Sequence, residues 1–540
     1  MLSAIILCRS DSSRLKNKHF CKIGKKYLIE VIIDKLLSNK YVNEVYIASG
    51  PYKKNFKFLE LKKIYQSRVK IYFHKNENNL IERIYFLSKK IINPNTLIIS
   101  GDCPIIDSNF IEIIYKNFLK FKDFDYVRSS KNVFYEGIML LKKVTWKKIY
   151  KISKKDNYGE YFSRILNDKK KLKIKKITVP KSILKTNKDN IRLSIDTVSD
   201  LNFFNLIFQK VKSYEKLNLK NILKYKKYSI VNSHVLQKKY NITYKKKVVI
   251  LTLANNKFGI GHFKRCLVLK RQIEETFSTN INFEYLNSED VNPNFISKYR
   301  FKKFRFTRKD KNVLLIIDLP QEKIKFLKKK LNVKIFSKII NIDSNLNLQK
   351  VINIYPQVKK RISKNNSLNL IGKDYLILDH NLIQYKFKKK KRYKRPLILS
   401  GGSSVPSIFF LNHLIDKKIK PLVVLGPLVD KNKITYLKKF TNKFKIIFSP
   451  KNYFDYIFNS ENVICRYGVS VFECIALGVK PHVIINDETS ERLKDIFLLE
   501  KMGYINVFRE HKKLICKHYA FNYKNFPIGA KFITNFLNDD

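Results

Sequence analysis

The stretch SAIILCRSDSSRLKNK, residues 3–18, joins an apolar run to a polar loop rich in Arg, Lys and Ser. The apolar run, residues 3–8, has the length and composition of a buried β-strand. Backbone N–H groups of a loop that leads from a strand towards a helix can hold phosphate oxygens, and nearby cations strengthen the binding. Basic loops after strands are common, so this stretch predicts an α/β fold and leaves its phosphate-binding role to be decided by the rest of the chain.

Strand-type apolar runs and amphipathic segments alternate beyond this stretch. They are the runs at 44–48, 69–73 and 96–100 and the segments with helical spacing at 27–39 and 79–91. Such alternation is typical of a doubly wound α/β layer with a mainly parallel sheet. We therefore predict a first domain over residues 1–232, followed by a polar, lysine-rich linker over 233–246.

Two further α/β series follow the linker. The strand-type runs of the second series are at 247–254, 313–320, 338–344 and 375–380, and those of the third are at 397–404, 421–427, 445–450 and 462–468. The charge run YKFKKKKRYKRP, residues 385–396, separates the two series as a solvated connector. We predict two Rossmann-like units, 247–384 and 397–540, that form a pair with a cleft between them.

The bulk composition restricts the class of protein. A chain of 540 residues with 44% hydrophobic residues is expected to form roughly two to four ordered domains. No apolar run approaches the roughly 20 residues that cross a bilayer, and the N-terminal MLSAIILC lacks the basic region of a signal peptide. The seven cysteines contain no CxxC pair, which argues against a disulfide framework and a zinc site. We expect a cytoplasmic protein.

The formal charge of +66 has two interpretations. Basic surfaces bind nucleic acids by releasing counterions from phosphates. The excess here is mainly lysine, spread along the whole chain together with abundant Asn, Ile, Tyr and Phe, which are the residues of AT-rich codons. No recognisable nucleic-acid motif occurs, so we attribute the charge to composition and expect no nucleic-acid partner. The charge should still favour anionic substrates such as nucleotides.

Two aspartates are predicted to lie near the basic loop of the first domain. Asp102 in SGDCP follows a strand-type run, and Asp196 in RLSIDTVSDL is expected to follow another short strand. Open α/β sheets bind ligands at the carboxyl ends of their strands. Two carboxylates that face a triphosphate there would suit Mg²⁺, although a single Asp after a strand is more often a helix cap or turn residue.

At this point the chain resembles the sugar cytidylyltransferases, the family of the CMP-Kdo synthetases, the CMP-nonulosonate synthetases and their spore-coat polysaccharide relatives. Motifs of that family look like A-R-x-x-S-x-R-L-x-x-K, then G-D-C-P, then R-x-x-x-D-T-x-x-D, and NLIERIY at 79–85 is similar to its D-V-L-x-R-Y. The matching residues are Arg9, Ser12, Ser13, Arg14, Leu15 and Lys18, then Gly101 to Pro104, then Arg192, Asp196, Thr197 and Asp200.

The resemblance implies a nucleotidyltransferase domain of GT-A-like fold in which a hydroxyl of an acidic sugar attacks the α-phosphate of CTP. It implies Mg²⁺ as cofactor, with Asp102 and Asp196 as catalytic metal ligands. The residues that it assigns to the CTP phosphates are Arg9, Ser12, Ser13, Arg14 and Lys18. Asp11 departs from the pattern because it stands where the family usually has Gly, and a carboxylate there would repel a phosphate.

A candidate general base lies in the second unit. In FGIGHFKRC, residues 258–266, a loop after a strand leads into a predicted amphipathic helix, and its glycines permit close approach of the backbone to a ligand. His262 lies close to the N-terminus of that helix, whose dipole favours a neutral, basic imidazole. Such a histidine can accept a proton from an attacking water. A capping or surface histidine is the alternative interpretation.

The third unit carries signals of a nucleotide site. SGGSS, residues 400–404, is a glycine-rich turn after a strand, and RYGVSVFECIALGVKP, residues 466–481, contains G-x-S-x-x-E followed by G-x-x-P. Gly468 and Ser470 can donate hydrogen bonds to a diphosphate, and Glu473 lies one helical turn further, within reach of ribose hydroxyls.

Residues 247 to about 510 resemble the UDP-sugar hydrolase of the pseudaminic acid pathway and its spore-coat relatives, which share the GT-B fold. The resemblance implies that His262 activates water at the anomeric carbon and that UDP leaves. The residues that it assigns to UDP are Gly261, Arg265, Gly401, Gly402, Ser403, Gly468, Ser470 and Glu473. Ser404 departs from a usual Asp, NDETSE at 486–491 from a usual Asn-Gln, and LANN at 253–256 lacks the family's charged residues.

Together these features predict a bifunctional enzyme of nonulosonic acid or surface polysaccharide biosynthesis, with CTP, an acidic sugar and a UDP-linked sugar as its small-molecule partners. Two alternatives remain at this level. The C-terminal half could be a GT-B glycosyltransferase that acts on an acceptor, or the chain could be a basic scaffold for RNA or membrane surfaces with decayed catalytic halves. The sequence leaves homo-oligomer formation open.

Overall fold

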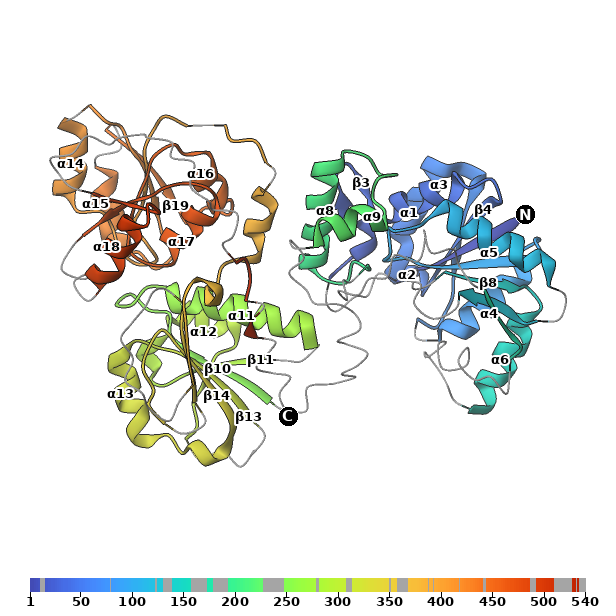
Figure 1. Ribbon diagram of the computed structural model, residues 1–540, viewed down its shortest axis with the longest axis horizontal. Helices are drawn as coiled ribbons and strands as arrows, with labels where there is room; N and C mark the ends of the chain where they lie inside the picture. The colour runs from blue at the N-terminus through green and yellow to red at the C-terminus, as the bar shows by residue number, and fades with distance from the viewer. Residues whose placement is uncertain are drawn as a thin grey trace. The chain divides into compact units, whose positions relative to one another are not determined.

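The computed structural model describes most of the chain in two compact units, Met1–Leu236 and Gln237–Asp540 (Figure 1). The described residues are 1–9, 15–77, 79–121, 124–129, 138–156, 172–177, 193–226, 247–277, 281–306, 313–348, 351–356, 368–386, 388–391, 393–416, 418–439, 443–485, 492–508, 527–530 and 532–533. The predicted linker, 233–246, lies outside them.

The first unit contains a seven-stranded sheet in the order β5-β4-β1-β6-β8-β7-β9. Neighbours among β5, β4, β1 and β6 are parallel, whereas β8 runs antiparallel to both β6 and β7. The sheet is therefore mainly parallel, as the alternation of segments predicts. The strands are β1 (Leu2–Leu7), β4 (Val42–Ser49), β5 (Val69–Phe73), β6 (Asn95–Ser100), β7 (Tyr126–Ser129), β8 (Met139–Lys142) and β9 (Ile174–Ile177).

Helices cover both faces of this sheet because consecutive residues of its buried strands point to opposite sides. In β1, Ala4 and Ile6 join the core that also holds residues of the first and fifth helices, whereas Ile5 packs with residues of the fourth and sixth. The doubly wound layer is thus confirmed. The helices concerned are α1 (Leu28–Leu37), α4 (Leu80–Lys90), α5 (Ser108–Lys120) and α6 (Thr145–Asp156).

The second unit begins with a seven-stranded, fully parallel sheet in the order β12-β11-β10-β13-β14-β15-β16. Its strands are β10 (Lys247–Thr252), β11 (Ile281–Tyr285), β12 (Lys302–Lys303), β13 (Val313–Asp318), β14 (Phe336–Ile342), β15 (Val351–Tyr355) and β16 (Leu368–Ile371). The helices are α11 (Gly261–Phe277), α12 (Pro293–Tyr299) and α13 (Gln321–Lys330). The sequence patterns anticipate β10, β13 and β14 but not β11, β12, β15 and β16.

A second parallel sheet follows in the same unit, with the order β19-β18-β17-β20-β21-β22. Its strands are β17 (Leu397–Leu399), β18 (Leu422–Leu425), β19 (Lys445–Phe448), β20 (Val463–Arg466), β21 (His482–Ile484) and β22 (Asn506–Phe508). The helices are α14 (Ile408–Asp416), α15 (Lys431–Lys438), α16 (Tyr453–Asn459), α17 (Val469–Ala476) and α18 (Leu493–Lys501). Both sheets are Rossmann-like, as predicted.

The prediction of a strand at 375–380 is wrong. This segment lies between two short 3₁₀ helices, and only an isolated bridge joins Leu378 to Gly529. Ile377 packs into the core of the first sheet of this unit, whereas Leu376 and Leu378 pack into the core of the second. The alternating pattern that resembles a strand therefore arises because one extended segment is anchored in two cores.

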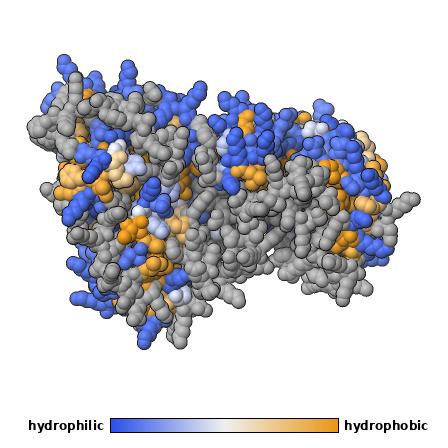
Figure 2. Space-filling model, in the orientation of Figure 1, coloured by the Kyte–Doolittle hydropathy of each residue, from blue (hydrophilic) through white to orange (hydrophobic). Residues whose placement is uncertain are grey.

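The described surface is mostly polar on the face seen in Figure 2, where hydrophilic residues surround small apolar patches. Among the described helices, none combines the length and the apolar composition needed to cross a membrane.

Candidate active sites in the two units

The first site lies at the carboxyl edge of the first unit's sheet, where one lysine holds two aspartates. Asp102 follows β6 directly, and Lys18 opens the short 3₁₀ helix Lys18–Phe20 after the basic loop. The Lys18 Nζ atom is 2.5 Å from Asp102 Oδ2 and 3.2 Å from Asp196 Oδ1. Three residues that the sequence places far apart therefore meet at one point.

The local structure around Asp196 differs from the prediction. The residues from 193 to 197 form no strand, and Asp196 instead precedes the helix α8 (Val198–Val211). Thr197 and Asp200 form a capping box for this helix, and the Asp196 N–H also donates to Asp200 Oδ2 at 3.0 Å. The Ile195 N–H donates to the Asp102 carbonyl at 2.8 Å, so a backbone hydrogen bond joins the two segments that carry the aspartates.

The charges of this site stabilise one another in a partly buried setting. Burial lowers the pKa of Lys18, but the carboxylates of Asp102 and Asp196 more than offset this effect and raise it. The other carboxylate oxygens accept hydrogen bonds from Ser100 at 2.6 Å and from Ser194 at 2.9 Å. Oxygen ligands from two carboxylates that already surround a cation fit Mg²⁺, which usually takes one or two protein carboxylates plus substrate phosphates. No cluster of three or more His, Cys, Asp or Glu side chains suited to a metal occurs among the described residues.

His19 joins the basic loop to the GDCP loop, a role that the sequence analysis misses. Its Nδ1–H donates to the Gly101 carbonyl at 2.8 Å, and its Nε2 accepts the Arg9 N–H at 3.3 Å. Burial, with the positive charge of Lys18, lowers its pKa to about 4, so the ring is neutral. A Cβ at position 101 would lie 2.5 Å from the Leu7 carbonyl, which explains the glycine of GDCP.

Three residues predicted to bind CTP phosphates, Ser12, Ser13 and Arg14, lie outside the described residues. Asp11, which departs from the family pattern, and Arg192, which matches its third motif, lie outside them too. The side chain of Arg9 is exposed, and its backbone faces His19.

The second site is centred on His262, the second residue of α11. Its Nδ1 lies 2.6 Å from Oδ1 of Asp318, the last residue of β13, which is fully buried. Arg265 Nη2 also lies 3.2 Å from this Nδ1, but the Asp318 oxygen is the closer partner. Because a carboxylate oxygen accepts hydrogen bonds, we assign the proton to Nδ1, which leaves Nε2 as the basic nitrogen. An imidazole oriented in this way presents one nitrogen that can take a proton from a bound hydroxyl or water.

Arg265 supports this pair. Its Nε and Nη2 atoms donate to the two oxygens of Asp318 at 2.9 and 2.7 Å, and its Nη1 donates to Asp343 at 3.0 Å. Burial lowers the pKa of this guanidinium, but Asp318 and Asp343 hold it above its ordinary value. The side chain is 5% exposed and binds these two carboxylates, while the expectation that it binds UDP stays a prediction.

The glycine loops of the two sheets in this unit touch each other. A Cβ at Gly402 would lie 2.7 Å from the backbone nitrogen of Ile260, next to Gly261, and one at Gly426 would lie 2.3 Å from the Gly401 carbonyl. Gly401 has φ 86°, a conformation that favours glycine. Ser403 lies in the same loop, and its Oγ would be 3.5 Å from a Cβ at position 259.

The G-x-S-x-x-E motif surrounds the start of α17. Gly468 is the N-cap, and Ser470 Oγ lies 3.1 Å from the hydroxyl of Tyr453. Glu473 is 3% exposed, and burial raises its pKa although the nearby Lys264 opposes the shift. Arg466 donates to Ser404 at 3.1 Å, so the serine that replaces a usual Asp faces a guanidinium. The segment 486–491 lies outside the described residues.

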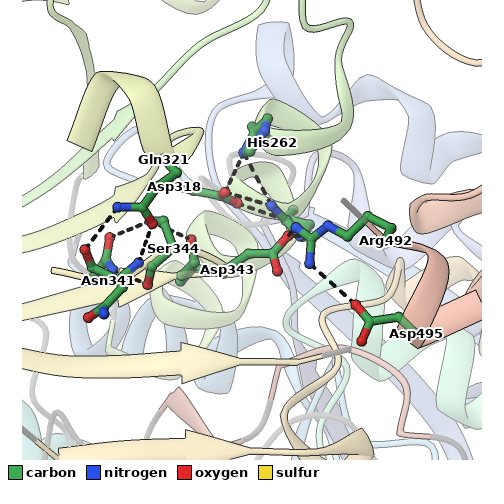
Figure 3. A network of polar contacts seen from close by, with 11 residues as sticks. His262, Asp318, Gln321, Asn341, Asp343, Ser344, Arg492 and Asp495 are labelled. Atoms are coloured by element: carbon green, nitrogen blue, oxygen red, sulfur yellow. Dashed lines mark hydrogen bonds and ion pairs between the residues drawn. The ribbon is translucent and has the colours of Figure 1, made fainter. Parts of the chain in front are cut away.

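Three charged residues of this site are missed by the sequence analysis, namely Asp318, Asp343 and Arg492. Asp318 and Asp343 end or follow apolar strands, which is the same signal that identifies Asp102. Arg492 donates to Asp343 at 3.2 Å from the other sheet of the unit, and no local pattern marks it (Figure 3).

Comparison with known proteins finds a family match in the first unit. Residues 3–230 match the model of the family described as cytidylyltransferase. An uncharacterized protein of Methanocaldococcus jannaschii is 28% identical over 247 residues, which cover 44% of this chain and 96% of the relative. A second uncharacterized protein of that organism is 27% identical over 316 residues, which cover 50% of this chain and 62% of the relative. The chain thus spans less than two thirds of this second relative.

Solved structures give weaker similarity. A cytidylyltransferase from Leptospira borgpetersenii is 21% identical, with 42% of this chain and 95% of that chain covered and a TM-score of 0.36. A CMP:2-keto-3-deoxy-manno-octonic acid synthetase complexed with CTP is 12% identical, with 39% of this chain and 99% of that chain covered and a TM-score of 0.29. Because these TM-scores are low, the family match over residues 3–230 is the finding that relates the first unit to cytidylyl transfer.

Proposed function

We propose that the chain is a bifunctional enzyme whose first unit transfers a cytidylyl group from CTP to an acidic sugar. This proposal for the first unit rests on the contacts of Lys18 with Asp102 and Asp196 at the edge of its sheet. These residues lie in the region that matches the cytidylyltransferase family. A sugar hydroxyl attacks the α-phosphate, the bond to the β-phosphate breaks, and pyrophosphate leaves. Mg²⁺ bound by Asp102 and Asp196 would neutralise the charge that develops on the phosphates.

The chain's own residues arrange this reaction. Lys18 is a mobile point charge, so we infer that its ammonium group moves from the carboxylates to the triphosphate when the nucleotide binds. His19 keeps the basic loop beside the GDCP loop through its two hydrogen bonds, because its neutral ring donates at one nitrogen and accepts at the other. These two hydrogen bonds connect the backbone of Arg9 to that of Gly101, next to Asp102.

We propose that the second unit hydrolyses a UDP-linked sugar, and the His262–Asp318 contact of 2.6 Å supports this half. The oxygen of a water molecule attacks the anomeric carbon, the proton goes to Nε2 of His262, and UDP leaves with the electrons of the broken C–O bond. Asp318 keeps the imidazole oriented and stabilises its protonated form. The glycine loop around Gly402 and the residues near Ser470 would hold UDP in a GT-B arrangement.

The two activities fit one route. Hydrolysis of a UDP-linked diacetamido-trideoxy sugar supplies a free sugar, and cytidylyl transfer activates the nonulosonic acid made from it by a condensation step. We therefore propose a role in nonulosonic acid or surface polysaccharide biosynthesis, with an acid related to pseudaminic or legionaminic acid as the sugar substrate.

Thermal unfolding of the full chain with CTP, CTP plus Mg²⁺, or UDP tests both halves without knowledge of the sugar. A ligand at 100 times its Kd adds about 2.7 kcal/mol, which raises a transition by several degrees. We expect Asp102→Asn to remove the Mg²⁺-dependent response to CTP only, and Glu473→Gln to remove the response to UDP only. If neither nucleotide shifts the wild-type transitions, the proposal is wrong. A product other than the free sugar would assign the second unit to glycosyl transfer.

A further inference from the structure

The loop after β14 holds Asp343 in an unusual backbone conformation. Its φ of 60° lies in the left-handed region, which costs on the order of 1 kcal/mol for a residue with a Cβ. A residue is kept in such a conformation only when the surrounding structure determines it. Aspartate adopts this conformation more readily than most residues, and the contacts around the loop hold it there.

Buried amides determine the path of this loop. Asn341 donates to the Ser344 carbonyl at 2.6 Å and to Asn353 Oδ1 at 2.8 Å, and Ser344 donates back to Asn341 at 3.0 Å (Figure 3). All three side chains are at most 1% exposed. On the outer side, Gln321 accepts the Asn345 N–H at 2.8 Å and donates to its carbonyl at 3.2 Å. The loop that presents Asp343 is therefore fixed from both sides.

The carboxylate of Asp343 connects two arginines from different sheets. Its Oδ2 accepts from Arg265 Nη1 at 3.0 Å and from Arg492 Nη2 at 3.2 Å, and its side chain is 9% exposed. Burial raises its pKa, but the two arginines together lower it below its ordinary value. Arg492 is the N-cap residue of α18, whose Ile496 and Leu499 pack in the core of the second sheet of the unit.

The contacts form a continuous path to the candidate base. Arg492 binds Asp343, which in turn binds Arg265. Arg265 donates two parallel hydrogen bonds to Asp318, and Asp318 contacts His262. A guanidinium is planar, so the two carboxylates that it binds fix each other's direction. Displacement of Asp343 would consequently be transmitted to the carboxylate that holds the imidazole.

We infer that Asp343 is a positioning residue for His262, and that Arg492 completes the arrangement from the other sheet of the unit. The role of Asp343 in catalysis rests on the proposed hydrolysis. The coupling of Asp343 and Arg492 to His262 can be measured without substrate. In this arrangement His262 reaches its working orientation and charge environment only when Asp343 contacts Arg492.

The pH dependence of His262 reactivity tests this coupling in the full chain. Diethylpyrocarbonate modifies unprotonated imidazole nitrogens, and its rate against pH gives the midpoint at which the ring loses its proton. Trypsin cleavage after Lys257 and Lys264 releases FGIGHFK, a peptide in which His262 is the single histidine, so mass spectrometry can follow this ring among the nine of the chain. Nε2 is the expected point of attack because Nδ1 faces Asp318.

Removal of the two charges should shift the His262 midpoint in opposite directions. Asp343→Asn removes a negative charge, which disfavours the protonated ring, so the midpoint should fall by roughly half a pH unit, about a threefold change in rate below it. Arg492→Gln removes the opposing positive charge, so the midpoint should rise by a similar amount. The titratable and charged groups that face Asp343 are Arg265 and His262 of α11, Arg492 before α18, Tyr355 of β15 and Tyr467 after β20.

The matched control is Asp290→Asn, which disrupts a buried ion pair with Lys323 at 2.8 Å in the same sheet layer but outside this path. It should leave the His262 midpoint unchanged even if stability falls. Equal midpoints in wild type, Asp343→Asn and Arg492→Gln, or shifts of the same sign, would overturn the inference. If Asp343→Asn does not fold, the expected rise in Arg492→Gln decides alone. Opposite shifts without hydrolysis of any UDP-sugar would retain the coupling and reject the proposed function.

Discussion

The two candidate sites place carboxylates at sheet edges in the same way but hold them with different cations. In the first unit, the ammonium group of Lys18 lies between Asp102 and Asp196. In the second, the guanidinium of Arg265 binds Asp318 through two atoms and Asp343 through a third. A lysine is a compact charge on a flexible chain, whereas an arginine imposes a planar geometry on its partners.

The difference indicates how each site would work under the proposed function. Lys18 would exchange its carboxylates for phosphate oxygens and free them for a metal ion. Arg265 is 5% exposed and cannot leave Asp318 without uncovering a buried charge, which is strongly unfavourable. The first site is therefore expected to rearrange on binding, and the second to work in the geometry that it already has.

The largest effect is expected where the second site depends on fixed geometry. Asp318→Asn preserves the shape but places an amide beside His262 Nδ1, which favours the wrong tautomer and removes the charge that stabilises the protonated ring. We expect release of UDP from a UDP-sugar to fall on the order of 10³-fold, with cytidylyl transfer unchanged. The two rates can be measured on one preparation. A loss below tenfold would mean that His262 does not act through this pair.

Lys18→Met tests whether the first site rearranges. Without the ammonium group, Asp102 and Asp196 are free to take a metal ion, so binding of Mn²⁺ without nucleotide should tighten about tenfold. Cytidylyl transfer should fall about 100-fold, because the triphosphate loses a cation. Electron paramagnetic resonance measures the first quantity and pyrophosphate release the second. Weaker binding of Mn²⁺ in the variant would show that Lys18 does not compete with the metal.

His19 makes the first unit sensitive to acid. Its pKa is about 4 in the folded chain and about 6.5 when unfolded, so its contribution is complete above pH 6.5 and is lost as the pH falls towards 4. The loss is at most roughly 3 kcal/mol for this buried ring. His19→Asn should flatten the pH dependence of unfolding in this window.

Fluorescence of Trp146, the single tryptophan of the chain, follows this unit because the residue is fully buried in its core. The control is His482→Asn in the second unit, where burial of the imidazole also lowers its pKa to about 4. That variant should leave the tryptophan transition unchanged. An unaltered slope in His19→Asn would locate the acid sensitivity elsewhere.

The smallest effect concerns the fixed contact between the glycine loops of the second unit. Gly402→Ala would place a Cβ 2.7 Å from the backbone nitrogen of Ile260. Overpacking of this kind costs about 1–3 kcal/mol, so calorimetry should show a lower transition for the second unit. Gly261→Ala is the matched variant, since its Cβ would meet nothing within 4 Å and alanine favours the helix that starts there. Equal unfolding temperatures in both variants would mean that the backbone near Ile260 can move away from a Cβ at position 402 at little cost.

Local patterns in the sequence determined the fold class and about half of the strands in the three large sheets. The alternation of apolar runs with helical spacing predicts the strands β1, β4, β5 and β6 and the helices α1 and α4 nearly to the residue. These predictions succeed because the period of side-chain burial is a property of short segments. The same reasoning explains why Asp102 and His262 are identified: each follows a strand at the edge where parallel sheets bind ligands.

Only the tertiary structure decided which charges meet. Asp196 reaches Asp102 from a segment without a strand, 375–380 is extended because two cores anchor it, and Arg265 binds two carboxylates. Asp343 and Arg492 are 149 residues apart, and neither carries a local signal of their contact. Burial and ion pairing depend on which elements pack together in space, and this information is not contained in any short stretch of the chain.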